Sequence, residues 1–95
     1  AMLFTSQGIM NMRNKKWEMD FSPIDIEGDS YVDTAYSKAY LHHLFKAKEL
    51  LAMQIASIHN LAFYLYLVGE ARKHIIGGDF SIWKSKMIEK LGQRL

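Results

Sequence analysis

Four histidines are the side chains best suited to bind a metal ion or transfer a proton in this sequence, which contains no cysteine. The lack of cysteine excludes a disulfide scaffold, a thiolate zinc finger and a cysteine nucleophile. His42, His43, His59 and His74 form neither an HExxH pair nor another known metal-binding spacing. His42 and His43 project about 100° apart on a helix, so we expect surface or interface positions for both. His59 lies in an apolar segment, where a hydrogen-bonded core histidine is expected.

A small basic cluster, formed by Arg13, Lys15 and Lys16, lies next to Trp17. Cationic side chains can contact nucleic-acid phosphates, but the same pattern is typical of a solvated loop. The sequence has no glycine-rich phosphate loop, no GxSxG motif and no carboxylate pair placed for acid–base catalysis. The residues by themselves therefore predict a helical domain with a hairpin and leave its chemistry open.

Length and composition predict one small soluble domain. The chain has 95 residues, 49% of them hydrophobic, and a net charge of +2, which excludes a disordered tail and is too small to indicate nucleic-acid binding. The first residues lack the features of a secretion signal. The most apolar run, residues 61–68, is much shorter than the about 20 residues of a membrane span. We therefore expect a protein without membrane contact, and the lack of cysteine fits a cytoplasmic location.

Residues 1–27 are expected to form a β-hairpin followed by a turn. Leu3–Thr5 and Ile9–Met12 flank a loop with Gly8, which favours a hairpin. Trp17 and Phe21 are expected on one side of a short helical turn. An isolated hairpin is barely stable in water, and no other segment is typical of a strand, so we expect the hairpin to lack its supporting partner in this chain.

Residues 28–95 are expected to be helical. One apolar stripe at helical spacing consists of Tyr36, Tyr40, Leu44, Ala47 and Leu51. A largely buried helix is expected over residues 49–76, with a bend or break at His59-Asn60 and an end at Gly77-Gly78. Asp79 is placed to cap a last helix. The inward face of that helix consists of Phe80, Trp83, Met87, Leu91 and Leu95.

Four motifs follow one another along nearly the whole chain: Leu3–Thr5 with Gly8–Asn14, Asp20–Asp25, Tyr36–Leu44 and Ser57–Tyr64. The first resembles an "LFT…G-x-x-N-I-(R/K)-N" hairpin and the second a "DF-x-P-(L/I)-D" turn. The third resembles a "(Y/W)-S-(R/K)-A-Y-(I/L)-x-H-L" helix and the fourth a "T-x-H-N-(L/I)-x-F-Y" segment. Together they resemble the C-terminal quarter of bacterial tRNA-guanine transglycosylase, also called queuine tRNA-ribosyltransferase.

The resemblance implies a mainly α fragment of a TIM-type (β/α)₈ barrel enzyme. Residues 1–27 would come from the barrel edge, and residues 28–95 would form a helical subdomain. The family exchanges guanine at the tRNA wobble position for a 7-deazaguanine such as queuine or preQ1, in queuosine biosynthesis, with one aspartate as nucleophile and another as acid/base. Both lie upstream of this chain's match, so the chain alone is expected to be inactive. The aspartates that match neither position are Asp20, Asp25, Asp29, Asp33 and Asp79.

The resemblance also implies a changed metal site. The family holds zinc with a C-x-C-x-x-C run and the histidine of the "H-N" motif, and the matching positions here are Gly28, Ser30, Asp33 and His59. Because structural zinc sites use four ligands, no zinc and no other cofactor is expected. Ser30 and Asp33 have the spacing of a capping box. Asp33 is also the first candidate for a hydrogen bond with His59, and Tyr31 and Val32 are candidates for added apolar contacts.

The resemblance also implies two binding surfaces, one for a second copy of the chain and one for tRNA. Tyr36, Tyr40 and His43 match the family's homodimer patch, although the tyrosines could equally be ordinary core residues. Contacts with tRNA phosphates are expected from Arg13, Lys15, Lys16 and Lys38. Two other functions stay open: a non-enzymatic helical protein-interaction module, and a small nucleic-acid-binding domain.

Overall fold

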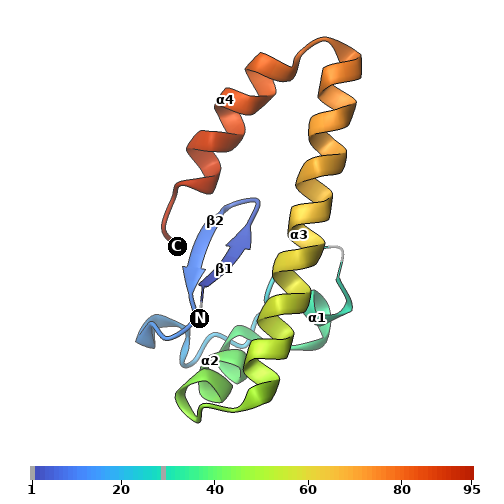
Figure 1. Cartoon of the computed structure of the whole chain (residues 1–95). Coiled ribbons are helices and arrows are strands. Elements are labelled where there is room, and N and C mark those ends of the chain that lie inside the picture. Colours follow the sequence, from blue (N-terminus) through green and yellow to red (C-terminus); the bar gives the residue numbers. More distant parts are fainter. Residues whose placement is uncertain (1, 29) are drawn as a thin grey trace.

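The computed structural model of the chain describes residues 2–28 and 30–95 and is mainly helical, with a two-stranded antiparallel hairpin at its start (Figure 1). The fold class predicted for the chain itself is therefore confirmed. The expected ranges 1–27 and 28–95 include Ala1 and Asp29, which lie outside the described residues.

The hairpin consists of β1 (Met2–Thr5) and β2 (Gly8–Asn11), as predicted. Thr5 lies opposite Gly8, and its hydroxyl accepts hydrogen bonds from the Gln7 and Gly8 amides, both at 3.2 Å. Gly8 has a φ of +147°, a conformation that glycine adopts without steric cost. The turn is thus closed by one threonine side chain and one glycine.

The free edge of β2 is paired with the C-terminal tail of the same chain. The Ile9 amide donates to the Gln93 carbonyl at 2.7 Å, and the Leu95 amide donates to the Ile9 carbonyl at 2.9 Å. Figure 1 shows the C-terminus returning to the side of the hairpin. The expectation that the hairpin lacks a partner in this chain is therefore wrong, because residues more than 80 positions apart complete it.

The helical turn η1 (Lys15–Trp17) follows the hairpin, and the Asn14 side chain accepts from the Lys16 amide at 3.1 Å. Trp17 is buried, and its indole donates to the Asn11 carbonyl at 3.0 Å. Phe21 is exposed, so the predicted shared side with Trp17 is wrong. The chain has left the helical turn before Phe21, where the Asp20 carbonyl accepts from the Ala39 amide at 2.7 Å.

Two short helices, α1 (Tyr31–Ala35) and α2 (Lys38–Lys46), replace the continuous stripe expected from Tyr36 onward. Tyr36 is extended, and the Ser37 hydroxyl caps α2 by accepting from the Tyr40 amide at 3.1 Å. Ala47 lies past the end of α2 and is exposed. The interruptions arise because the serine side chain offers the backbone a helix start that apolar spacing does not reveal.

The long helix α3 (Leu50–Gly77) is confirmed, but it runs without the expected break at His59-Asn60. The expectation that it is largely buried is wrong, because its buried residues are only Ala52, Ile55, Ala56, His59 and Phe63, all in its first half. Gly78, with a φ of +82°, ends it in the left-handed conformation. The last helix, α4 (Phe80–Leu91), has the predicted inward residues Phe80, Trp83, Met87 and Leu91 half-buried, whereas Leu95 lies past its end. Asp79 stands at its N-terminus without a capping hydrogen bond, contrary to prediction, because its carboxylate is instead bonded to His74 Nδ1 at 2.7 Å.

The core lies where the hairpin, η1, α1, α2 and the first half of α3 meet. Its buried apolar side chains are Leu3, Met10, Met12, Trp17, Ile24, Val32, Leu41, Leu44, Phe45, Ala52, Ile55 and Ala56. The second half of α3 extends away from this core, and α4 runs back from its far end toward the hairpin (Figure 1). The chain has dimensions of 46 × 22 × 19 Å.

Several apolar side chains of α3 are exposed to solvent. Leu61, Leu65 and Val68 are 61%, 60% and 43% exposed. By length and composition α3 is able to cross a membrane, with a mean hydropathy of 1.4 over its best window, 22% of which is buried. Its first half packs on the core and carries His59 and Asn60, so we assign α3 as the core helix of this fold.

Candidate functional site

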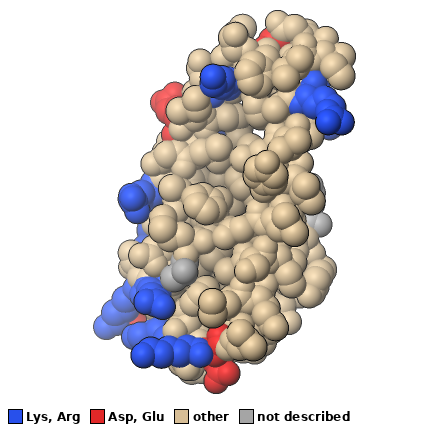
Figure 2. Space-filling model, viewed as in Figure 1, with Lys and Arg blue, Asp and Glu red and all other residues tan. Residues whose placement is uncertain are grey.

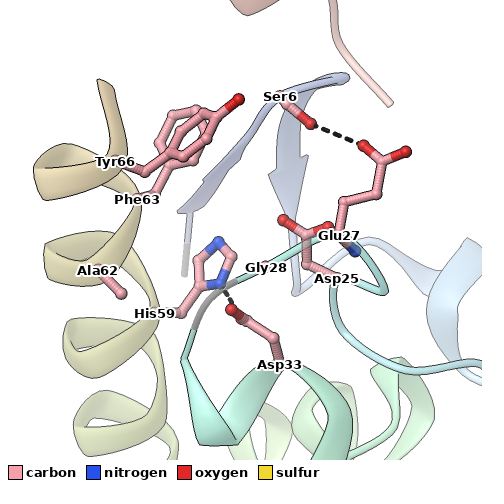
Figure 3. Close-up of a pocket in the computed structure, with 9 residues that line it drawn as sticks. All are labelled: Ser6, Asp25, Glu27, Gly28, Asp33, His59, Ala62, Phe63 and Tyr66. Atoms are coloured by element: carbon pink, nitrogen blue, oxygen red, sulfur yellow. Dashed lines mark hydrogen bonds and ion pairs between the residues drawn. The ribbon is translucent and has the colours of Figure 1, made fainter. Parts of the chain in front are cut away.

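His59 lies in the first half of α3, is 1% exposed and has hydrogen bonds at both ring nitrogens. Figure 3 shows the bond to Asp33. Its Nε2 donates to the Phe4 carbonyl of β1 at 2.8 Å, because a carbonyl oxygen can only accept. Its Nδ1 is hydrogen-bonded to the Asp33 carboxyl group. The predicted core histidine and its predicted partner are both confirmed.

Asp33 is buried in the first turn of α1, where its second oxygen accepts from the Ser30 amide at 3.0 Å. The Ser30 hydroxyl in turn accepts from the Val32 amide at 3.3 Å, which completes the predicted capping box. Val32 is buried, as expected of an apolar contact, whereas Tyr31 is 68% exposed. The expectation for Tyr31 is wrong because that position of the short helix faces solvent.

Asn60, next to His59, binds the same edge of β1. Its side-chain oxygen accepts from the Phe4 amide and its nitrogen donates to the Met2 carbonyl, both at 3.0 Å. Asn60 belongs to the Ser57–Tyr64 motif, but the sequence predicts no contact for its side chain. The available signal was the combination of a polar pair inside an apolar helix with an unsupported hairpin.

A small pocket of about 50 Å³ adjoins His59. Its lining consists of Ser6, Asp25, Glu27, Gly28, Asp33, His59, Ala62, Phe63 and Tyr66 (Figure 3). Burial raises the pKa of Asp25 above its ordinary value, and the nearby Asp33 adds to this effect. The Asp25 carboxylate accepts from the Glu27 amide at 3.1 Å, and the Glu27 carboxylate accepts from Ser6 at 3.3 Å. These polar groups thus hold neighbouring segments together.

Sequence comparisons identify the proteins that share this arrangement of motifs. The family profile described as "Queuine tRNA-ribosyltransferase" matches residues 1–93. The chain belongs to this family. It is 45% identical to a queuine tRNA-ribosyltransferase of Aquifex aeolicus (strain VF5) over 98% of this chain and 25% of that protein.

Two further queuine tRNA-ribosyltransferases show the same extent of similarity. The protein of Helicobacter pylori (strain ATCC 700392 / 26695) is 45% identical over 99% of this chain and 25% of its own length. The protein of Clostridium kluyveri (strain ATCC 8527 / DSM 555 / NBRC 12016 / NCIMB 10680 / K1) is 46% identical over 93% of this chain and 23% of its own. The chain thus spans about a quarter of the length of these relatives.

Two lysine side chains of this queuine tRNA-ribosyltransferase family member, Lys16 and Lys38, lie over the Trp17 ring. Lys16 Nζ lies 4.8 Å from the centre of the indole ring and Lys38 Nζ lies 5.9 Å from it. Lys38 also donates to the Ser22 hydroxyl at 2.9 Å, while Arg13 and Lys15 are exposed. Figure 2 shows lysine and arginine side chains grouped at the lower left, where η1 packs against α2.

The predicted aromatic patch of this family member is partly brought together. The rings of Tyr36 and Tyr40 stack with centroids 5.7 Å apart and an angle of 9° between their planes. Tyr40 is 43% exposed and Tyr36 is half-buried. His43 is exposed on α2 with Tyr40, whereas Tyr36 lies before the start of that helix.

The other histidines have separate roles. His42 is buried, contrary to the expected surface position, and its Nδ1 donates to the Met12 carbonyl at 2.7 Å. His74 stacks on Trp83, with 5.0 Å between the ring centroids. Among residues 2–28 and 30–95, no three histidine or acidic side chains are grouped so as to hold a metal ion.

Proposed function

We propose that this chain is the C-terminal part of a tRNA-guanine transglycosylase, an enzyme that exchanges guanine for a 7-deazaguanine at the tRNA wobble position. The observation that carries the proposal is the family match over residues 1–93, combined with coverage of about a quarter of each relative. The proposed parent is a TIM-type barrel enzyme of the cytoplasm, a location that the lack of cysteine supports.

The chain by itself is proposed to be inactive, because the family's catalytic aspartates match no residue of it. The described aspartates are held by neighbours. Asp20 accepts from the Ser22 amide at 3.0 Å, Asp33 is bonded to His59, and Asp79 is bonded to His74. Such engaged carboxylates are poorly placed to attack a nucleoside.

The function is tested with a chimera in which this chain replaces the matching quarter of the Aquifex aeolicus relative. We expect the chimera to incorporate labelled guanine into tRNA, whereas the isolated chain should incorporate none. Circular dichroism checks that both proteins are folded. A folded chimera without exchange activity would contradict the proposal and favour a separate interaction module.

The patch formed by Arg13, Lys15, Lys16 and Lys38 is proposed to contact tRNA phosphates. Its support is that Lys16 and Lys38 lie over the Trp17 ring and that Arg13, Lys15 and Lys16 are exposed. Contacts of this kind position a nucleic acid without recognising its bases. The exchanged base itself would be bound by the missing barrel.

The patch formed by Tyr36, Tyr40 and His43 is proposed to be the homodimer surface of the parent enzyme. Tyrosine is favoured at interfaces because it buries a large apolar area while keeping a polar hydroxyl. The stacking of Tyr36 on Tyr40 and the exposure of Tyr40 and His43 support this assignment.

A further inference from the structure

The four positions that the family resemblance assigns to zinc have side chains engaged elsewhere in this chain. His59 Nε2 carries a hydrogen that is donated to Phe4, and His59 Nδ1 faces the Asp33 carboxyl group. A metal ion needs a free nitrogen lone pair, so binding would require His59 to give up one of these bonds. The histidine as placed here does not fit a metal ligand.

The other three positions fit a metal no better. Gly28 has no side chain, and a Cβ atom at this position would collide with the Asp33 carboxylate. Ser30 uses its hydroxyl to accept from the Val32 amide. Asp33 divides its two oxygens between His59 and the Ser30 amide. The loop is therefore closed around the Asp33 side chain, which occupies the space that a ligand at position 28 would need.

We infer that the Asp33–His59 pair is a metal-free junction that takes over the structural role of a bound ion. The junction joins three segments. Asp33 belongs to α1, His59 belongs to α3, and Phe4 belongs to β1. A structural ion also joins segments distant in sequence, and here one buried carboxyl–imidazole pair does so.

The junction depends on its parts being present together. Asp33 and His59 are both 1% exposed, and removing one partner of a buried hydrogen bond leaves the other polar group buried without a partner, which destabilises the fold. Gly28 is required because only hydrogen fits between its backbone and the Asp33 side chain. Glycine at position 28 and aspartate at position 33 are therefore expected to act as a unit.

The first test measures metal in the 95-residue chain after incubation with excess zinc sulfate and removal of unbound ion. We expect well below one zinc ion per chain by mass spectrometry and a melting temperature unchanged by EDTA. One zinc ion per chain that is lost in His59→Gln but kept in His43→Gln would overturn the inference. Trace zinc that is lost in His43→Gln and kept in His59→Gln would support it, since that binding is to the surface.

The second test separates the junction from the helix cap. Ser30→Ala removes the hydroxyl cap alone and should lower the melting temperature by about 4–8 °C. Asp33→Ala also removes the partner of His59 and should lower it by at least twice as much. Asp33→Asn, which keeps the size and one acceptor oxygen, should give a loss between these values and stays measurable if Asp33→Ala does not fold. Equal losses for Ser30→Ala and both Asp33 variants would overturn the inference.

Discussion

Phe4 and Ile9 face each other across the hairpin, and each points its own amide and carbonyl away from the other strand. The outward groups of Phe4 are bonded to His59 and Asn60 of α3. Those of Ile9 are bonded to the carbonyl of Gln93 and the amide of Leu95. A two-stranded hairpin, marginal by itself, is thus stabilised on one edge by helix side chains and on the other by the chain terminus.

Replacing Asn60 with alanine should loosen β1. The change leaves the Phe4 amide and the Met2 carbonyl without their partner and should cost about 1–3 kcal/mol of unfolding free energy. Chemical denaturation measures the loss, and hydrogen exchange should show faster exchange at the Phe4 amide. Gln54→Ala, on an exposed position of α3, is the control and should change stability by less than about 0.5 kcal/mol. Equal stability of the two variants would contradict the assigned contact.

Glycine-to-alanine substitutions should act in opposite directions at two positions. Gly8→Ala should destabilise the chain by more than about 1 kcal/mol, because φ is +147° and the added Cβ would overlap the Gln93 carbonyl. Gly69→Ala should stabilise it by about 0.5–1 kcal/mol, since Gly69 lies in the interior of α3 with open space around it. Thermal unfolding of both variants checks the prediction, and a neutral Gly8→Ala would show that the tail does not pair with β2.

Asp25→Asn should raise stability at neutral pH. Burial raises the pKa of Asp25, so the folded state holds its proton to higher pH than the unfolded state does. The resulting stability is present below the ordinary value of 3.8 and is lost as pH rises through the folded pKa. Asparagine avoids this loss and can still accept from the Glu27 amide. Melting temperatures should therefore differ at pH 7 and converge as the pH falls toward 3.8; a constant difference would be evidence against burial as the cause.

Neutralising Lys15 and Lys16 with glutamine in the chimera should weaken tRNA binding and make it less sensitive to salt. Each lost phosphate contact should reduce the slope of log affinity against log salt concentration by about 0.7–0.9. Lys84→Gln with Lys86→Gln, on the exposed surface of α4, provides a control of equal charge change. A slope that both pairs change equally would assign the η1 lysines to solvent.

Tyr40→Ala should weaken self-association of the chimera. Truncating a central interface aromatic commonly costs more than about 1.4 kcal/mol, which corresponds to a tenfold rise in the dissociation constant. Sedimentation velocity measures the change, with Tyr64→Ala on the exposed side of α3 as the control. An unchanged dissociation constant would mean that Tyr40 serves only to stack on Tyr36.

Local pattern was sufficient to predict the features that depend on neighbours in sequence. The hairpin turn at Gly8, the end of α3 at Gly78 and the capping box of Ser30 with Asp33 each depend on a few adjacent residues. The Asp33–His59 contact was predicted differently, from the positions that the family resemblance placed together.

Features set by distant parts of the chain could not be predicted in this way. The C-terminal residues Gln93 and Leu95 pair with Ile9 through backbone atoms, so no pattern of side chains predicts this pairing. His42 is buried because the Met12 carbonyl offers its ring nitrogen a partner from another element. Asp79 occupies the N-cap position of α4, but its carboxylate is hydrogen-bonded to His74 across the turn between α3 and α4.

The open leucine and valine side of α3 has a practical consequence for anyone producing this polypeptide. Leu61, Leu65 and Val68 are exposed apolar residues on a helix that extends beyond the core (Figure 1). Exposed apolar patches favour aggregation, so the yield and monodispersity of the protein should improve when these three positions carry glutamate or lysine. Handling in dilute solution, at low temperature and with mild detergent, suits the natural sequence.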